Sequence, residues 1–179
     1  MTVFQPDAIT LPGNLEPDNP LWRYALACWQ VPAMAEHCLS LQANGWSVTR
    51  ILCAGWLGLQ GCRFNGQEAA TVTEWRSRVT VQIRSARQAL SRDPGPAQAL
   101  RKRLAEAELQ AEQTELALAW YTLKELAQEA SPMNERQTTI LDNLMAAAPD
   151  HSSARHATES LYLLATLLAK HPEGDPATC

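Results

Sequence analysis

The apolar residues between positions 72 and 90 constrain the fold more than any other feature of this chain, because they recur at helical spacing. The repeat consists of Val72, Trp75, Val79, Ile83, Ala86 and Leu90. Steps of three and four residues place these side chains on one face of a helix, which we predict over residues 68–91. The run Asp93-Pro94-Gly95-Pro96 ends it. No stretch alternates in polarity for long enough to predict a strand, so the fold is predicted to be all-α.

A second, longer helix is predicted over residues 97–129. One of its apolar stripes consists of Leu100, Leu104, Ala107, Ala111, Thr114, Leu118 and Tyr121. The other, on the opposite side, consists of Leu109, Leu116, Trp120 and Leu123. A helix that is apolar on two sides is expected to be contacted from both. We therefore predict one long central helix in the fold.

Shorter helices are predicted on either side of this pair. Asp18 or Asn19, followed by Pro20, is a typical helix start. Pro32 starts a second helix, Asn44-Gly45 ends it, and Ser47 can cap a third. Two further helices are predicted beyond the long one, the last of them near residues 152–170.

These elements predict a single-domain, all-α helical bundle of about six to seven helices, which is a common size for 179 residues. The helical domain is predicted to span residues 19–170. Residues 1–18, which are rich in proline, are predicted to form an extended or disordered arm. Residues 171–179 are predicted to be a frayed tail.

The segment from Leu21 to Cys62 contains four of the six tryptophans and four of the five cysteines. Trp residues of this kind either fill a core or anchor a partner. Trp22, Leu26 and Trp29 share one face of the first predicted helix, and we expect that face, like Trp56 in the third, to point inward.

Trp46 differs from these tryptophans because it follows Gly45 in a turn between helices, where packing does not obviously require it. We therefore predict that it is an exposed anchor. Tyr24 and Arg50 are the other candidate partner-binding residues, since Tyr and Arg are enriched at binding hot spots.

Charged residues of opposite sign are concentrated in the two long predicted helices. Residues 76–103 contain seven arginines and one lysine, and residues 106–129 contain six glutamates. If the helices pack antiparallel, the facing groups would be Arg76, Arg84 and Arg87 on one side and Glu108, Glu112 and Glu115 on the other. Three interpretations stay open: an ion-pair network that fixes the register, a polar pocket that binds an anionic ligand, and a dimer interface.

Composition argues against several classes of function. A formal charge of −4 does not suit a nucleic-acid-binding protein. Neither a signal peptide nor a stretch of about 20 apolar residues is visible, so we expect no membrane association and a cytoplasmic location.

The cysteines form no C-x-x-C pair, and we expect free thiols, no metal and no cofactor. No nucleotide-binding or hydrolase motif occurs, so whether the chain is an enzyme stays open.

Several residues also resemble those of a known family. They are Trp22 with Ala25, the run Cys38-Leu39-x-Leu41-Gln42, Gly45 with Val48, and Leu52 with Trp56-Leu57. Trp75, the Arg84-x-x-Arg87 pair and Ala107-Glu108-Leu109-x-Ala111-Glu112 extend the match to residues 20–125.

This pattern resembles a proteobacterial family of small helical proteins filed as a domain of unknown function. The resemblance implies a cytoplasmic helical protein of bacterial type and supplies no activity. The sequence departs from the pattern at Trp46-Ser47-Val48-Thr49, where an acidic and an amide residue are expected around the valine. The resemblance therefore implies no role for two such polar groups at these positions of the sequence.

Two functions are consistent with these features. The first is a non-catalytic interaction or adaptor protein that uses the Trp-rich helices to bind a protein partner, with a homodimer as one possible assembly. The alternative is a small-molecule binder or enzyme with a pocket formed by Arg76, Arg84, Arg87, Glu108 and Glu112 between the two long helices.

Overall fold

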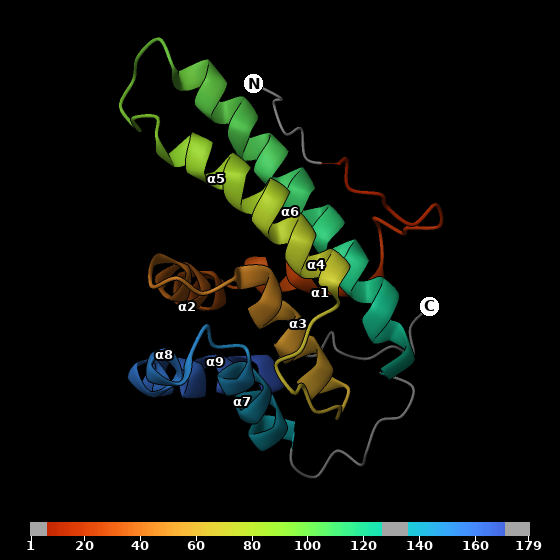
Figure 1. The fold of residues 1–179 in the computed structure, drawn as a ribbon. Helices are drawn as coiled ribbons and strands as arrows, with labels where there is room; N and C mark the ends of the chain where they lie inside the picture. Colours follow the sequence, from red (N-terminus) through yellow and green to blue (C-terminus); the bar gives the residue numbers. More distant parts are fainter. Residues whose placement is uncertain (1–6, 127–135, 171–179) are drawn as a thin grey trace.

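A long helical hairpin projects from a body of shorter helices (Figure 1). The computed structural model describes residues 7–126 and 136–170, and every regular element within them is a helix. The hairpin consists of α4 (Ala70–Trp75), the π-helical turn η1 (Arg76–Thr80), α5 (Val81–Gln88) and α6 (Gln98–Leu126). The body consists of α1 (Pro20–Trp29), α2 (Pro32–Ala43), α3 (Val48–Leu59), α7 (Arg136–Ala146), α8 (His151–His156) and α9 (Thr158–Lys170).

The all-α prediction is therefore confirmed, and the predicted helices correspond to observed ones. The helix predicted over residues 68–91 is the continuous α4–η1–α5 arm. The last predicted helix is divided at Ala157 into α8 and α9. The predicted end of the long helix near residue 129 lies outside the described residues, as do residues 1–6 of the predicted arm and the predicted tail at 171–179.

The first three helices begin and end at the residues that the sequence indicates. The Asn19 side chain accepts a hydrogen bond from the backbone N–H of Trp22 at 2.9 Å, and Pro20 occupies the first turn of α1. The Ser47 hydroxyl caps α3 by accepting from the N–H of Arg50 at 3.3 Å. Between α2 and α3 the chain reverses at Gly45, whose φ of 87° lies in the left-handed region that glycine adopts without strain.

The centre of the body is α3, in which every residue except Arg50 is buried. It packs against α1, α2, α6, α7 and α9. Its closest neighbour is α7: a Cβ atom added to Gly58 would lie 2.8 Å from the Cα of Ile140. Glycine at this position lets the two backbones approach to a distance that any larger residue prevents.

Only part of the long helix α6 belongs to this core. Its two predicted apolar stripes are both buried where the helix passes the body, from Leu116 to Ala119. Towards the hairpin tip the same stripes are less buried: Leu104 and Ala107 are half-buried, and Leu100 and Leu109 each have more than half of their surface accessible. The second half of α6 is thus a core element, whereas the first half depends on α5 for its packing.

The inner face of α1 differs from the predicted one. Leu21, Tyr24, Ala25 and Cys28 are buried, whereas Leu26 and Trp29 are 43% and 41% exposed. The expectation that Leu26 and Trp29 point into the core is therefore wrong. Two stripes on this short helix have helical spacing and apolar character, so periodicity alone could not select the one that is buried.

Residues 7–18 form neither helix nor strand and run beside the hairpin. Arg78 donates a hydrogen bond to the carbonyl oxygen of Asp7, and Gln113 donates to that of Pro17 at 3.3 Å. Lys124 at the other end of α6 lies 3.5 Å from Glu16. These contacts attach the described part of the arm to the outside of the hairpin.

The close approach at Gly58 generates a stability prediction. Replacing Gly58 with Ala should lower the free energy of unfolding by about 2 kcal/mol, because the added methyl group meets the backbone of α7 rather than a side chain that can move. Gly95→Ala is the matched control, since its Cβ would lie 3.9 Å from the nearest atom. Urea denaturation of both variants measures the difference, and equal stabilities would contradict the packing described for α3 and α7.

Candidate functional site

The first arm of the hairpin contains one π-helical turn, Arg76–Thr80, which changes the face that meets α6. A π-turn adds a residue to one turn of a helix and so rotates all the following residues about the helix axis. Thr80 is buried as a result, and Arg84 and Arg87 bond to α6, whereas Ala86 of the predicted apolar stripe is exposed. The interior of the hairpin is therefore polar where sequence periodicity predicted an apolar seam.

The base of this polar interior is organised by Glu115, which is 1% exposed. Its carboxylate accepts hydrogen bonds from Nε of Arg76 at 2.7 Å and from the hydroxyl of Thr80 at 2.8 Å. The hydroxyl of Thr49 on α3 donates a third hydrogen bond. Glu115 thus joins the two arms of the hairpin to the body.

Glu68 extends the same network towards the loop that precedes α4. It accepts two hydrogen bonds from Arg76, at 2.6 and 2.7 Å, and one from Arg50 at 3.0 Å. Arg50 also donates to the carbonyl oxygens of Gly66 and Ala146, at 2.7 and 3.2 Å. Its guanidinium group therefore fixes the loop between α3 and α4 against the end of α7.

A second cluster lies further along the hairpin. Arg84 bonds to Glu108 at 2.8 Å and to Glu112 at 2.6 Å. Arg87 donates two hydrogen bonds to Glu108, one of them at 3.2 Å. Nearer the tip, Arg101 donates to the carbonyl oxygen of Leu90 at 2.9 Å. The structure therefore brings Arg84, Arg87, Glu108 and Glu112 together inside the hairpin, whereas Arg76 belongs to the first cluster, with Glu68 and Glu115.

The two glutamates of this cluster differ in how well their charge is compensated. Burial alone would raise the pKa of Glu108, but hydrogen bonds from Arg87 and Arg84 outweigh it, and the pKa is lowered. The pKa of Glu112 is raised, because burial outweighs the attraction of Arg84, and Glu108 adds repulsion. Only one oxygen of Glu112 accepts a hydrogen bond from any residue that the structure describes.

An apolar groove lies on the side of α6 where Glu108 and Glu112 come to the surface. It has a volume of about 280 Å³ and runs between α1, α2 and α6, with α3 beneath it. Its lining includes Trp22, Leu26 and Trp29 of α1, Leu39 and Gln42 of α2, Val48, Thr49 and Leu52 of α3, Arg87 of α5, and Ala105, Glu108, Leu109, Glu112 and Leu116 of α6.

Four large apolar side chains of this groove are exposed to solvent. Leu26, Trp29, Leu39 and Leu109 have between 41% and 52% of their surface accessible, and they come from three different helices. An exposed apolar cluster with polar groups beside it is typical of a binding surface. We refer to these four side chains as the groove rim. Leu39 and Leu109 were not among the predicted binding residues, because their apolar character is plain from the sequence but their exposure is not.

The residues predicted to anchor a partner lie elsewhere. Trp46 is 3% exposed and Tyr24 4%, so the expectation that Trp46 is an exposed anchor is wrong. The left-handed turn at Gly45 directs the chain back towards α2, where the N–H of Trp46 bonds to the carbonyl of Leu41 at 3.2 Å, and the indole enters the core. Tyr24 packs beside Gly55 of α3. Arg50 is bonded to the loop before α4, as described above.

The cysteines in the described part of the chain are free thiols. Burial raises the pKa of Cys28 to about 11 and that of Cys38 to about 12. It also raises the pKa of Cys53, where the nearby Glu68 adds to the effect. Since the thiolate is the reactive form, these three residues are packing groups rather than nucleophiles.

Within residues 7–126 and 136–170, no three His, Cys, Asp or Glu side chains are arranged so that they could hold a metal ion. Among the helices that the structure describes, none has both the length and the apolar character needed to cross a bilayer.

The burial of Trp46 is tested by comparing it with Trp29. Trp46→Ala should lower the free energy of unfolding by about 3–5 kcal/mol, as expected when a core Trp is truncated. Trp29→Ala removes the same group from a half-exposed site and should cost about 1 kcal/mol or less. Chemical denaturation of the two variants measures both values. A small loss for Trp46→Ala would contradict its place in the core.

The different surroundings of Glu108 and Glu112 predict opposite effects on stability. With its lowered pKa, ionised Glu108 stabilises the fold above its ordinary pKa, and this contribution is lost as the pH falls through the lowered value. The raised pKa of Glu112 means that its protonated form is favoured in the fold, and that contribution is lost as the pH rises through the raised value.

At pH 7, Glu108→Gln should therefore destabilise the protein by about 2–3 kcal/mol, because two arginines lose their charged partner. Glu112→Gln should leave the free energy of unfolding unchanged or raise it, and its difference from the wild type should shrink as the pH is lowered. Urea denaturation at pH 7 and at acidic pH tests both statements. Equal losses for the two variants at pH 7 would show that Glu112 is compensated as fully as Glu108.

Comparison with known proteins places the chain in a family. A family model described as "Protein of unknown function (DUF2390)" matches residues 20–119, which run from the start of α1 into the buried part of α6. No curated protein matches the chain, and no solved structure does. The matched residues make up more than half of the sequence, so the chain belongs to this family of proteins of unknown function.

Proposed function

We propose that this protein is a non-catalytic interaction protein that binds another protein in the groove between α1, α2 and α6. The observation that carries the proposal is the groove rim: Leu26, Trp29, Leu39 and Leu109 are exposed around one apolar hollow. Leaving such a cluster in water is unfavourable by roughly 25 cal/mol for each Å² of apolar surface that a partner could cover. All residues that line the groove fall within the family match at 20–119.

The position of the rim favours a protein over a small ligand. A small molecule on the floor of the groove would contact side chains such as Leu52 and Leu116 but would leave the outer parts of the rim in water. A protein segment lying along the groove covers the floor and the rim together. Buried Trp and Leu contacts of this kind supply most of the affinity in protein interfaces.

The alternative, an anionic-ligand binder or enzyme that uses the Arg/Glu cluster, is supported less well. Arg76, Arg84 and Arg87 each donate hydrogen bonds to a glutamate. An anionic ligand would have to displace these carboxylates before a guanidinium group could hold it. The contacts favour the interpretation of the cluster as an ion-pair network that fixes the register of the hairpin.

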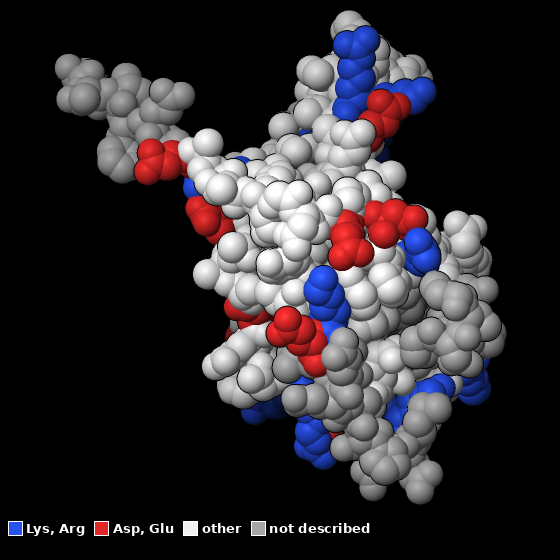
Figure 2. Space-filling model, turned by 90° about the vertical axis from the view of Figure 1, so that its right-hand side faces the viewer, with Lys and Arg blue, Asp and Glu red and all other residues white. Residues whose placement is uncertain are grey.

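Charge and cysteine chemistry support the rest of the proposal. On the face shown in Figure 2, acidic and basic side chains are interspersed and leave wide uncharged areas between them. With a formal charge of −4, this distribution suits a protein partner better than a nucleic acid. We also propose a cytoplasmic location, which the free thiols of the described cysteines support.

The proposal is tested by a matched pair of substitutions on α6. Leu109→Glu places a charge on the groove rim, whereas Leu100→Glu places the same charge at an equally exposed leucine that does not line the groove. The wild type and Leu100→Glu should capture the same proteins from the source cells, and Leu109→Glu should not capture them. Titration with the purified partner should then show at least a tenfold weaker affinity for Leu109→Glu, equivalent to about 1.4 kcal/mol.

Circular dichroism of both variants first establishes that they are folded. Sedimentation velocity of the purified protein shows whether the partner is a second copy of the chain, in which case Leu109→Glu would make a dimer monomeric. The proposal is rejected if no interaction depends on Leu109 while the protein remains folded.

A further inference from the structure

We infer that the groove accepts an amphipathic helix of a partner protein, and that a lysine or arginine on its apolar side pairs with the carboxylate of Glu112. This inference rests on the function proposed above and specifies the chemistry of the partner. The geometry points to it through the shape of the groove and through Glu112, which is the less compensated of the two carboxylates that line the groove.

The shape of the groove suits a helix. Its sides are formed by helices, α1 and α2 on one side and α6 on the other, and its floor contains Val48 and Leu52 of α3. Amphipathic helices bind such grooves through apolar side chains spaced at i, i+3, i+4 and i+7. The groove residues of α6 have this spacing themselves, since Ala105, Leu109, Glu112 and Leu116 follow one another at steps of four, three and four.

Glu112 interrupts this apolar stripe on α6. One of its oxygens accepts a hydrogen bond from Arg84 at 2.6 Å, and no described residue donates to the other. Glu108 and Glu115, in contrast, each accept three hydrogen bonds. The side chain of Glu112 is 24% exposed and lines the groove, so its second oxygen can be reached by an occupant.

Covering the groove removes water from this carboxylate. A carboxylate that loses its water without gaining a partner is costly, so an entirely apolar helix is a poor occupant. An acidic side chain at this place would be repelled by Glu112, whereas Glu108 beside it is paired with Arg84 and Arg87. A lysine or arginine provides the missing donor, and its methylene groups can lie against the apolar walls. The raised pKa of Glu112 agrees with a carboxylate that lacks such a donor in the free protein.

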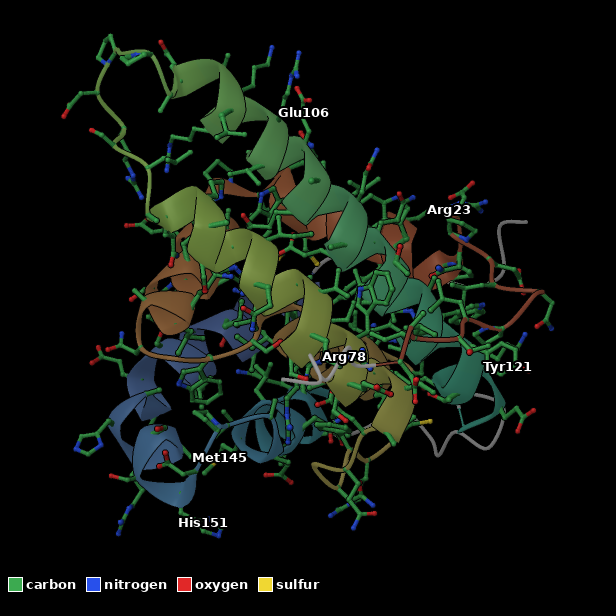
Figure 3. All side chains as sticks on the ribbon, turned by 45° about the horizontal axis from the view of Figure 1, so that its top comes forward. Arg23, Arg78, Glu106, Tyr121, Met145 and His151 are labelled. Atoms are coloured by element: carbon green, nitrogen blue, oxygen red, sulfur yellow. The ribbon has the colours of Figure 1, made fainter. Side chains whose placement is uncertain are left out.

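The outward-facing glutamates of the hairpin do not meet these conditions. Figure 3 shows Glu106 pointing away from the body of the molecule, on the outer side of α6, and its side chain is exposed. A cation beside Glu106 would form a solvated pair, which contributes little to affinity. Glu106 therefore serves as the matched control for Glu112.

The inference is tested by selecting peptides rather than by assuming a partner. A display library of helical peptides, with randomised residues on one face, is selected on the wild type and depleted on Leu109→Glu. We expect the enriched peptides to carry apolar residues at helical spacing with one Lys or Arg among them. A synthetic peptide of this sequence should bind Glu112→Gln about tenfold more weakly than the wild type, and should bind Glu106→Gln with unchanged affinity.

Replacing the basic residue of the peptide with norleucine completes a double-mutant cycle. If the cation pairs with Glu112, the norleucine peptide should bind Glu112→Gln at least as tightly as the wild type, because it covers the carboxylate of the wild type without supplying a donor. Groove-dependent peptides without a preferred basic residue, or with equal affinity for Glu112→Gln, overturn this inference and leave the proposed function standing. If no enriched peptide depends on Leu109, the proposed function fails and the inference fails with it.

Discussion

The buried carboxylate of Glu115 is the interaction on which the arrangement of the hairpin depends. It lies where the hairpin meets the body, and its three donors come from both: Thr49 from α3, and Arg76 and Thr80 from η1. An ionised carboxylate in the interior is tolerated only when such donors surround it. Because two donors come from η1 and one from α3, this carboxylate of α6 holds the first arm, α6 and α3 in place relative to one another.

The π-helical turn lies at the residues that meet this carboxylate. Arg76 and Thr80 are four residues apart, so their side chains lie on the same side of the arm, and both bond to Glu115. The π-turn rotates the rest of the arm, so that Arg84 and Arg87 meet Glu108 and Glu112. One extra residue in one turn thus converts an apolar seam into a series of ion pairs that continues towards the tip.

This rotation also explains which parts of the structure the sequence could predict. The helix boundaries follow local signals, such as Asn19 with Pro20 and Ser47, and these operate in the same way in any context. The opposite charges of the two long helices likewise predicted their pairing. A π-turn has no such local signature, so the exposure of Ala86 could not be read from periodicity. The core position of Trp46 depends on a turn at Gly45 that brings α2 and α3 together, and this is a tertiary effect.

The groove could not be predicted from the sequence, for a related reason. Both stripes of α1 are apolar, and only the position of α3 decides that Tyr24 is buried and Trp29 is not. Similarly, Leu109 lies on the same predicted stripe of α6 as the core residue Leu116, seven residues before it, yet Leu109 is exposed and Leu116 is buried. A pattern of apolar residues shows which faces can be buried, and the neighbouring elements determine which of them are.

Because the interior of the hairpin is polar, the apolar residues of the groove rim are not the ones that join its two arms. Ion pairs of Arg84 and Arg87 with Glu108 and Glu112 join the two arms. Leu109 is therefore not needed inside the hairpin, and it can lie at the groove without weakening the contact between the arms. Arg87, Glu108 and Glu112 belong both to these ion pairs and to the groove, and of the two glutamates it is Glu112 that has one oxygen bonded within the hairpin and the other without a donor among the described residues. Through this residue, the same ion pairs that set the register of the hairpin also set the charge that an occupant of the groove encounters.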